Sequence, residues 1–168
     1  VRSRRQRQMC IRDRIWATGL VAIIIAIVLY NSGEGYPTIL RLPAMALLIA
    51  GFVAIDCGSS LFCAQRMRWG LPVGIGLIGI VAVTFFFVQG LSGIATASAN
   101  LAIAALMSLT GWRFWVHRHE ALLGMGAVAV LYGATALSFA ACAAVLFIEG
   151  PAVLTLRPSN WAEELNAV

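Results

Sequence analysis

Residues 71–110, with the sequence LPVGIGLIGIVAVTFFFVQGLSGIATASANLAIAALMSLT, are forty consecutive residues without one charged side chain. A helix crosses the hydrocarbon core of a bilayer with about 20 apolar residues, so forty are too many for a single crossing. The turn-type residues QGLSG at 89–93 interrupt the stretch near its middle. The sequence therefore predicts two membrane spans, at about 71–88 and 92–110, joined by a short turn.

The composition of the whole chain agrees with a membrane location. Of 168 residues, 61% are hydrophobic and 11% are charged, and the mean hydropathy is +0.89. A soluble domain is about half apolar and about a quarter charged, so these side chains cannot cover a water-facing surface. A chain of this length holds about four to six spans and no sizeable domain outside the membrane.

Three further apolar stretches complete an all-α, polytopic fold. They lie at about 15–30, 37–63 and 121–148. The first is short for a crossing and needs its flanking residues to reach the interfaces, and it has no clear signal-peptide cleavage site. We expect about five spans, with four as the alternative, in one helical domain over 14–151 that is followed by a short polar tail at 152–168.

The arginines give the orientation of these spans, because cytoplasmic loops collect positive charge. The links at 31–35 and 89–93 carry no arginine, whereas basic residues flank the pair of spans in the middle of the chain. These residues are Arg66, Arg68, Arg113 and Arg118. Two basic links on one side require an even number of crossings between them, so we expect a cytoplasmic N-terminus and an external tail.

Tryptophan and tyrosine prefer the headgroup level of a bilayer, which gives a second test of the span boundaries. Tyr132 is the one such residue placed deep inside a predicted span. Those at predicted span ends are Trp16, Tyr30, Tyr36, Trp69, Trp112 and Trp115.

The first thirteen residues differ from the rest of the chain. Residues 4–13, RRQRQMCIRD, resemble the translation of a transposon adapter used to prepare sequencing libraries. We expect residues 1–13 to be non-native and favour this over a basic arm that binds acidic lipid or RNA. Their exclusion lowers the net charge from +5 to +1, so no nucleic-acid partner is expected.

Two polar residues within the spans are candidate functional groups. Asp56 is an acid inside an apolar stretch, where ionisable residues are costly and often functional. It is a candidate for proton or sodium coupling, and the favoured alternative places it near the cytoplasmic interface. Asn100, with Thr96 and Ser98, carries polar atoms into the fourth span. We favour a hydrogen bond to a neighbouring helix over contact with a solute.

Glycines form two groups that indicate helix packing. Gly74, Gly76 and Gly79 match the G-x-G-x-x-G pattern of dinucleotide-binding folds, but no predicted strand precedes them. Small residues let membrane helices approach closely, so a packing stripe is the better interpretation. Gly124, Gly126 and Gly133, together with many alanines, give the last span a small-residue surface. Such a surface suits a partner helix.

No catalytic residue, cofactor or metal site is assigned. His117, His119 and Glu120 are close in sequence, but their spacing puts the histidines on different helix faces, and an interfacial loop is the plainer interpretation. The cysteines after residue 13 lack metal-binding or paired spacing. They are Cys57, Cys63 and Cys142.

The order of weak motifs over residues 14–151 resembles the TctB family, the small membrane subunit of tripartite tricarboxylate transporters. RIWATGL at 14–20 resembles the basic start and Gly-Leu span of that family, and Tyr36-Pro37 with LRL at 40–42 resembles its entry to span two. QGLSGIAT at 89–96 and GWR at 111–113 resemble its linker and the exit from the next span. EGYP at 34–37 and EGP at 149–151 depart from its glycine–proline and leucine–proline sequences.

The resemblance implies a non-enzymatic accessory subunit in the bacterial inner membrane. Its partners would be a large polytopic transporter subunit and, indirectly, a periplasmic solute-binding protein, and the complex would take up carboxylates. The alternative is an unrelated homo-oligomeric channel or carrier whose path is lined by Asp56 and Asn100. A membrane enzyme that uses His117, His119 or Asp56 comes third.

Overall fold

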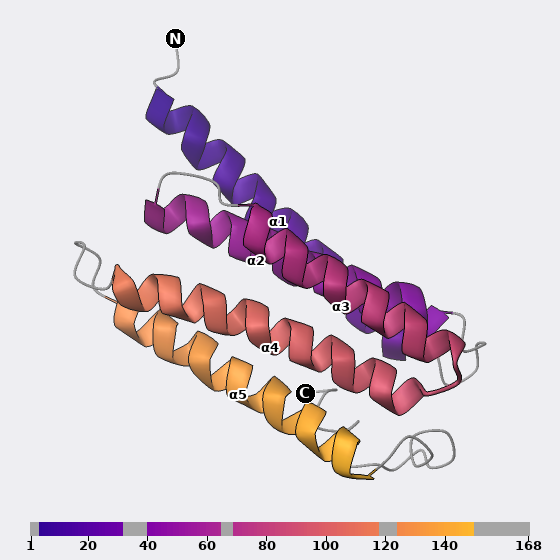
Figure 1. Ribbon diagram of the computed structural model, residues 1–168. Coiled ribbons are helices and arrows are strands. Elements are labelled where there is room, and N and C mark those ends of the chain that lie inside the picture. Colours follow the sequence, from indigo (N-terminus) through magenta and orange to yellow (C-terminus); the bar gives the residue numbers. More distant parts are fainter. Residues whose placement is uncertain (1–3, 32–39, 65–68, 118–123, 150–168) are drawn as a thin grey trace.

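The computed structural model describes residues 4–31, 40–64, 69–117 and 124–149, and in these residues every regular element is a helix. Figure 1 shows the five helices side by side, with their axes roughly aligned. All five are long and apolar enough to cross a membrane, which confirms the all-α polytopic fold. Their bounds are α1 Arg4–Asn31, α2 Arg41–Ala64, α3 Gly70–Val88, α4 Ser92–Val116 and α5 Met125–Glu149.

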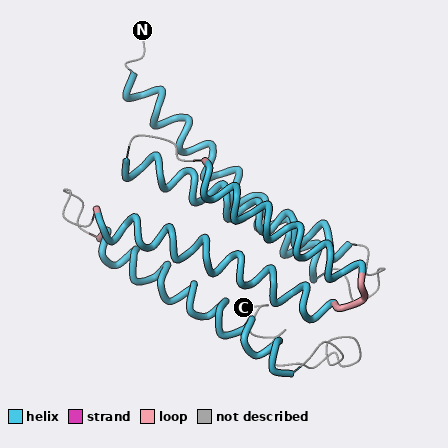
Figure 2. The backbone as a smooth tube through the Cα atoms, viewed as in Figure 1, coloured by secondary structure: helices cyan, strands magenta, loops and turns pink. Residues whose placement is uncertain are grey.

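The turn predicted at 89–93 separates α3 from α4 and is visible in Figure 2 as a short loop. Gly90 has a φ of +76°, a left-handed conformation that favours glycine. The amide of Leu91 donates to the carbonyl oxygen of Phe86 at 2.9 Å, and the amide of Gly90 donates to that of Phe87 at 3.0 Å. These two bonds form a Schellman motif, which ends α3 and frees the chain to reverse.

Other helix ends differ from the predicted span limits. α4 continues to Val116 instead of ending near residue 110, and α1 begins at Arg4, inside the segment expected to be non-native. α2 and α5 begin at Arg41 and Met125, while the earlier limits, 37 and 121, lie outside the described residues. The extension of α4 carries Arg113 into the helix, where its charge has a partner.

The order of contacts makes α1 and α5 the edge helices. The principal contacts join α1 to α2, α2 to α4, and α4 to α5, and α3 packs against both α2 and α4. α2 and α4 therefore form the centre of the bundle. They are also the two helices with the largest buried share of their spans.

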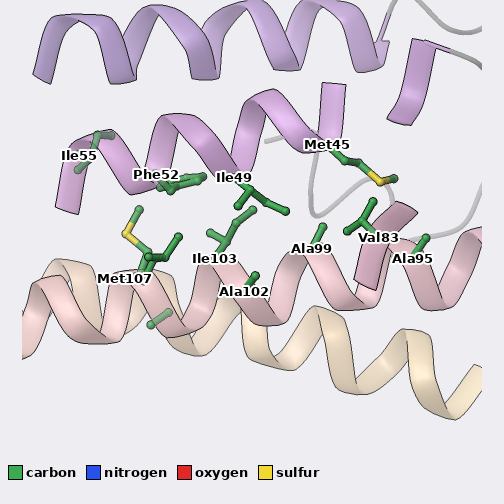
Figure 3. Close-up of a cluster of buried hydrophobic side chains, with 12 residues drawn as sticks. Met45, Ile49, Phe52, Ile55, Val83, Ala95, Ala99, Ala102, Ile103 and Met107 are labelled. Atoms are coloured by element: carbon green, nitrogen blue, oxygen red, sulfur yellow. The ribbon is translucent and has the colours of Figure 1, made fainter. Parts of the chain in front are cut away.

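The main apolar core lies between α2 and α4, as Figure 3 shows. Ile49 of α2 and Ile103 of α4 are fully buried there, and Val83 joins them from α3. Phe52 contacts Phe139 of α5 edge to face, with ring centroids 5.9 Å apart. In a bilayer this close packing stabilises the bundle mainly through van der Waals contacts, because lipid tails are as apolar as these side chains.

Glycines bring α1 and α2 together. A Cβ atom added to Gly51 would lie 2.9 Å from the carbonyl oxygen of Gly19 and 2.7 Å from Cγ1 of Ile23. One to two turns further on, the indole ring of Trp16 occupies the place that a side chain at Gly58 would take. The two helices can approach this closely only because both glycines on α2 lack side chains.

Candidate functional site

Asp56 is the centre of a buried polar cluster. Its side chain is 0% exposed, and it lies eight residues before the end of α2, about 12 Å along the helix axis. Nη1 of Arg113, on α4, lies 2.7 Å from Oδ2 of Asp56, and the arginine side chain is 14% exposed. Asp56, which was considered for ion coupling or for a place near the cytoplasmic interface, therefore has a counter-charge on the neighbouring helix.

Thr110 supplies a third member of this cluster. Its hydroxyl oxygen is 2.8 Å from Oδ1 of Asp56 and 3.0 Å from the carbonyl oxygen of Leu106, so its single proton has two acceptors within reach. Nη1 of Arg113 also lies 3.3 Å from the main-chain oxygen of Asp56. Both carboxylate oxygens are thus hydrogen-bonded, which a buried carboxylate requires.

The local spacing on α4 explains how the cluster forms. Thr110 and Arg113 are three residues apart, so they lie on the same face of the helix. Arg113 was not among the predicted site residues, because its place after the fourth predicted span indicated a charge in a loop. The sequence signal for this role was the position of Arg113 just past an apolar span. If the helix continues by one more turn, the arginine stays on the helix, and its long side chain can extend toward the bilayer core. Of the arginines used for orientation, Arg66, Arg68 and Arg118 lie outside the described residues.

The cluster has the properties of a structural link between α2 and α4. The pair is electrically neutral as a whole, and its members hydrogen-bond to one another. Removal of one partner from such a pair costs about 3–5 kcal/mol, because the other charge stays buried without compensation. Among the residues that the structure describes, no group of three His, Cys, Asp or Glu side chains is placed to hold a metal ion.

The remaining candidates for chemistry are separated from one another. His117 follows the last turn of α4, with its ring Nδ1 2.9 Å from the carbonyl oxygen of Arg113, while His119 and Glu120 lie outside the described residues. Cys57 and Cys142 are buried, free thiols on α2 and α5. Cys63 is buried near the end of α2.

Asn100 lies on α4 and is 4% exposed. The hydroxyl groups of Thr96 and Ser98 donate to carbonyl oxygens of their own helix, at 3.0 Å and 2.8 Å. The side-chain nitrogen Nδ2 of Asn100 is buried without a hydrogen-bond partner among the described residues. The amide that was expected to bond to a neighbouring helix therefore donates to none of the helices in the part of the chain that the structure describes. Asn100 instead lines a cavity of about 130 Å³.

The predicted packing glycines divide into two groups. Gly76 and Gly79 of α3 are buried, and a Cβ atom at either one would lie 2.5–2.6 Å from a side-chain carbon of α2 or α4. The others have no atom of another described residue within 4 Å of that position. These are Gly74 on α3, Gly124 just before α5, and Gly126 and Gly133 on α5.

Comparison with family models, with curated proteins and with solved structures finds no match for this chain. The fold itself defines the class, a multi-pass helical membrane protein, with five candidate spans in the described residues.

Proposed function

We propose that this chain is an accessory membrane subunit of a tripartite tricarboxylate-type transporter, supporting carboxylate uptake by a large polytopic subunit and a periplasmic solute-binding protein. The proposal places it in the bacterial inner membrane with a cytoplasmic N-terminus. Two observations support the proposal. One is the motif resemblance over residues 14–151, and the other is the outer surface of α5 in the structure.

A line of small side chains runs along that surface, between exposed bulky ones. Ala127, Ala134 and Ala141 are exposed and recur at intervals of seven residues, so they follow one line along the helix. Gly133 is exposed beside them. Small residues in such a line let a second helix approach closely in a membrane, where packing provides the attraction. We call Ala127, Ala134 and Ala141 the α5 stripe.

The other edge helix has a different outer surface. α1 exposes bulky branched side chains, which suit contact with lipid tails. They are Leu20, Val21, Ile24, Ile25, Ile27 and Val28. α5 also exposes bulky side chains, such as Val130, Leu131 and Leu137, but they lie beside a continuous line of small residues that the described side chains of α1 do not form. This difference favours α5 as the side on which a partner helix docks.

The buried ion pair counts against the alternative of a carrier or channel lined by Asp56. Arg113 neutralises Asp56, whose side chain is fully buried. A group that binds and releases ions during transport needs access to water or to the solute. A structural role for this pair suits an accessory subunit, and the proposal includes no catalytic activity.

Co-purification tests the proposal. Residues 14–168 carrying an affinity tag would be expressed with the neighbouring genes of the native locus and purified in mild detergent. We expect a stoichiometric complex with a large membrane subunit. Ala134→Phe should abolish this complex, whereas Ala17→Phe, the same change at an exposed position on α1, should retain it. Recovery of this chain alone, as a homo-oligomer, would reject the proposal.

A further inference from the structure

The cavity beside Asn100 lies between the two edge helices. Its walls come from α1, α2, α4 and α5, and α3 contributes none of the lining residues. Figure 3 shows three of them, Met45 and Phe52 of α2 and Ala99 of α4. Ile27 of α1 also lines the cavity and is itself 46% exposed. The cavity therefore lies next to the outer surface of the bundle at α1, a surface that would face lipid in a membrane.

Asn100 contributes a polar side chain to the lining of the cavity. It is eight residues from the start of α4, about 12 Å along the helix axis. Its Nδ2 group carries two N–H donors and has no acceptor among the described residues. Nδ2 itself is buried beside the cavity, so the amide must turn about its Cβ–Cγ bond to present this group to an occupant. Buried polar groups are normally hydrogen-bonded, so an occupant with an acceptor atom would then supply the missing partner.

The chemistry of the walls restricts the occupant. None of the described lining residues carries a charged side chain, so an anion inside would be desolvated without a counter-charge from them. A hydrocarbon chain of a lipid would fit the apolar walls, but it has no acceptor for the amide at this depth. The occupant is therefore neutral and mostly apolar, and it carries an oxygen acceptor.

Size and shape point to a single ring. The cavity volume of about 130 Å³ is close to the ~150 Å³ of an engineered apolar cavity that binds benzene. The rings of Phe52 and Phe139, which meet edge to face, both line it. Such faces and edges pack well against another ring.

We propose that this cavity is a binding site for a small neutral ring compound with a carbonyl oxygen, such as an aromatic ketone or a quinone-type head group, which enters from the bilayer and accepts a hydrogen bond from Nδ2 of Asn100. The site is independent of the accessory role, since it faces away from the α5 stripe and uses other residues.

A matched pair of probes tests the site. 4-Fluoroacetophenone has the required carbonyl, and 4-fluoro-α-methylstyrene has the same shape with a CH₂ group in place of the oxygen. Their binding to the purified full chain in detergent would be measured by ¹⁹F NMR. Partition into micelles is common to all protein variants, so differences between variants report the site. We expect the ketone to bind about tenfold more tightly than the hydrocarbon, as one added buried hydrogen bond allows.

Two variants complete the test. Asn100→Leu keeps the volume but removes the donor, so it should bind both probes equally. Ala44→Leu, at a fully buried lining position, should weaken both. Equal affinities of the wild type for the two probes, or no binding of either, would overturn the proposal. If the ketone does not bind and Asn100→Leu instead abolishes self-association, the amide is a contact between two copies, and the ligand site is rejected.

Discussion

The ion pair between Asp56 and Arg113 allows a quantitative prediction through a double-mutant cycle. The two side chains are joined at 2.7 Å and Asp56 is fully buried. With charge centres about 4 Å apart and an effective dielectric constant near 20, their attraction is about 4 kcal/mol. Arg113→Met should therefore lower the free energy of unfolding by about 3–5 kcal/mol, because it leaves the carboxylate without its counter-charge.

Asp56→Leu should cost less than Arg113→Met. Arg113 lies three residues before the end of α4 and is partly exposed, so its long side chain can turn toward the interface when Asp56 is absent. We expect a loss of about 2–4 kcal/mol. The double variant replaces the pair by apolar side chains and should return to within about 1 kcal/mol of the wild type, because such replacements are often neutral.

Titration with SDS in mixed micelles, followed by circular dichroism, measures the four free energies. Arg41→Met is the matched control. Arg41 lies at the start of α2 with its guanidinium 5.8 Å from the ring centre of Tyr30, and loss of this contact should cost at most about 1 kcal/mol. If the double variant is as unstable as the sum of the two single variants, the side chains do not interact, and the interpretation of the cluster as a link between helices fails.

Two further predictions concern packing, and the same titration measures both. Gly79→Ala should destabilise the bundle by about 1–3 kcal/mol, because the new methyl group would lie 2.6 Å from Cβ of Ala102. Gly74→Ala on the same helix meets no neighbouring helix of the described residues within 4 Å and should cost nothing; equal effects would contradict the arrangement of α3. Asn100→Leu, without added ligand, should raise stability by about 1 kcal/mol, because it removes a buried donor that has no partner, and a clear loss of stability would show that the amide already has one.

The span count was predictable because it depends on local quantities. Residues 71–110 lack charge over twice the length of a crossing, and the turn residues at their middle define where the chain reverses. The Schellman motif at Gly90 follows directly from that sequence. Helix type and approximate boundaries therefore needed no knowledge of how the helices pack.

The pairing of Asp56 with Arg113 depends on tertiary structure. These residues are 57 positions apart, and their contact requires both the close approach of α2 to α4 and the continuation of α4 past residue 110. The positive-inside rule assigns such an arginine to a loop, since it considers each charge by itself. That rule does not predict which residue of another helix pairs with the arginine.

Which glycines make helix contacts was also not predictable from the sequence. Gly74 and Gly79 are five residues apart on α3 and therefore lie on different faces, of which only one meets α2 and α4. Gly51 and Gly58, which hold α1 against α2, were not among the predicted packing residues. Small residues are frequent in this chain, and only the arrangement of the helices decides which of them are contacts.

Site-specific photocrosslinking at Ala134 tests the central claim most directly. A benzoylphenylalanine residue placed there, in the middle of the α5 stripe, would be irradiated in native membranes that contain the neighbouring gene products, with Ala17 on α1 as the control position. The proposed function predicts one adduct with a large membrane subunit from position 134 and none from position 17. Adducts only between copies of this chain, or equal adducts from both positions, would contradict it.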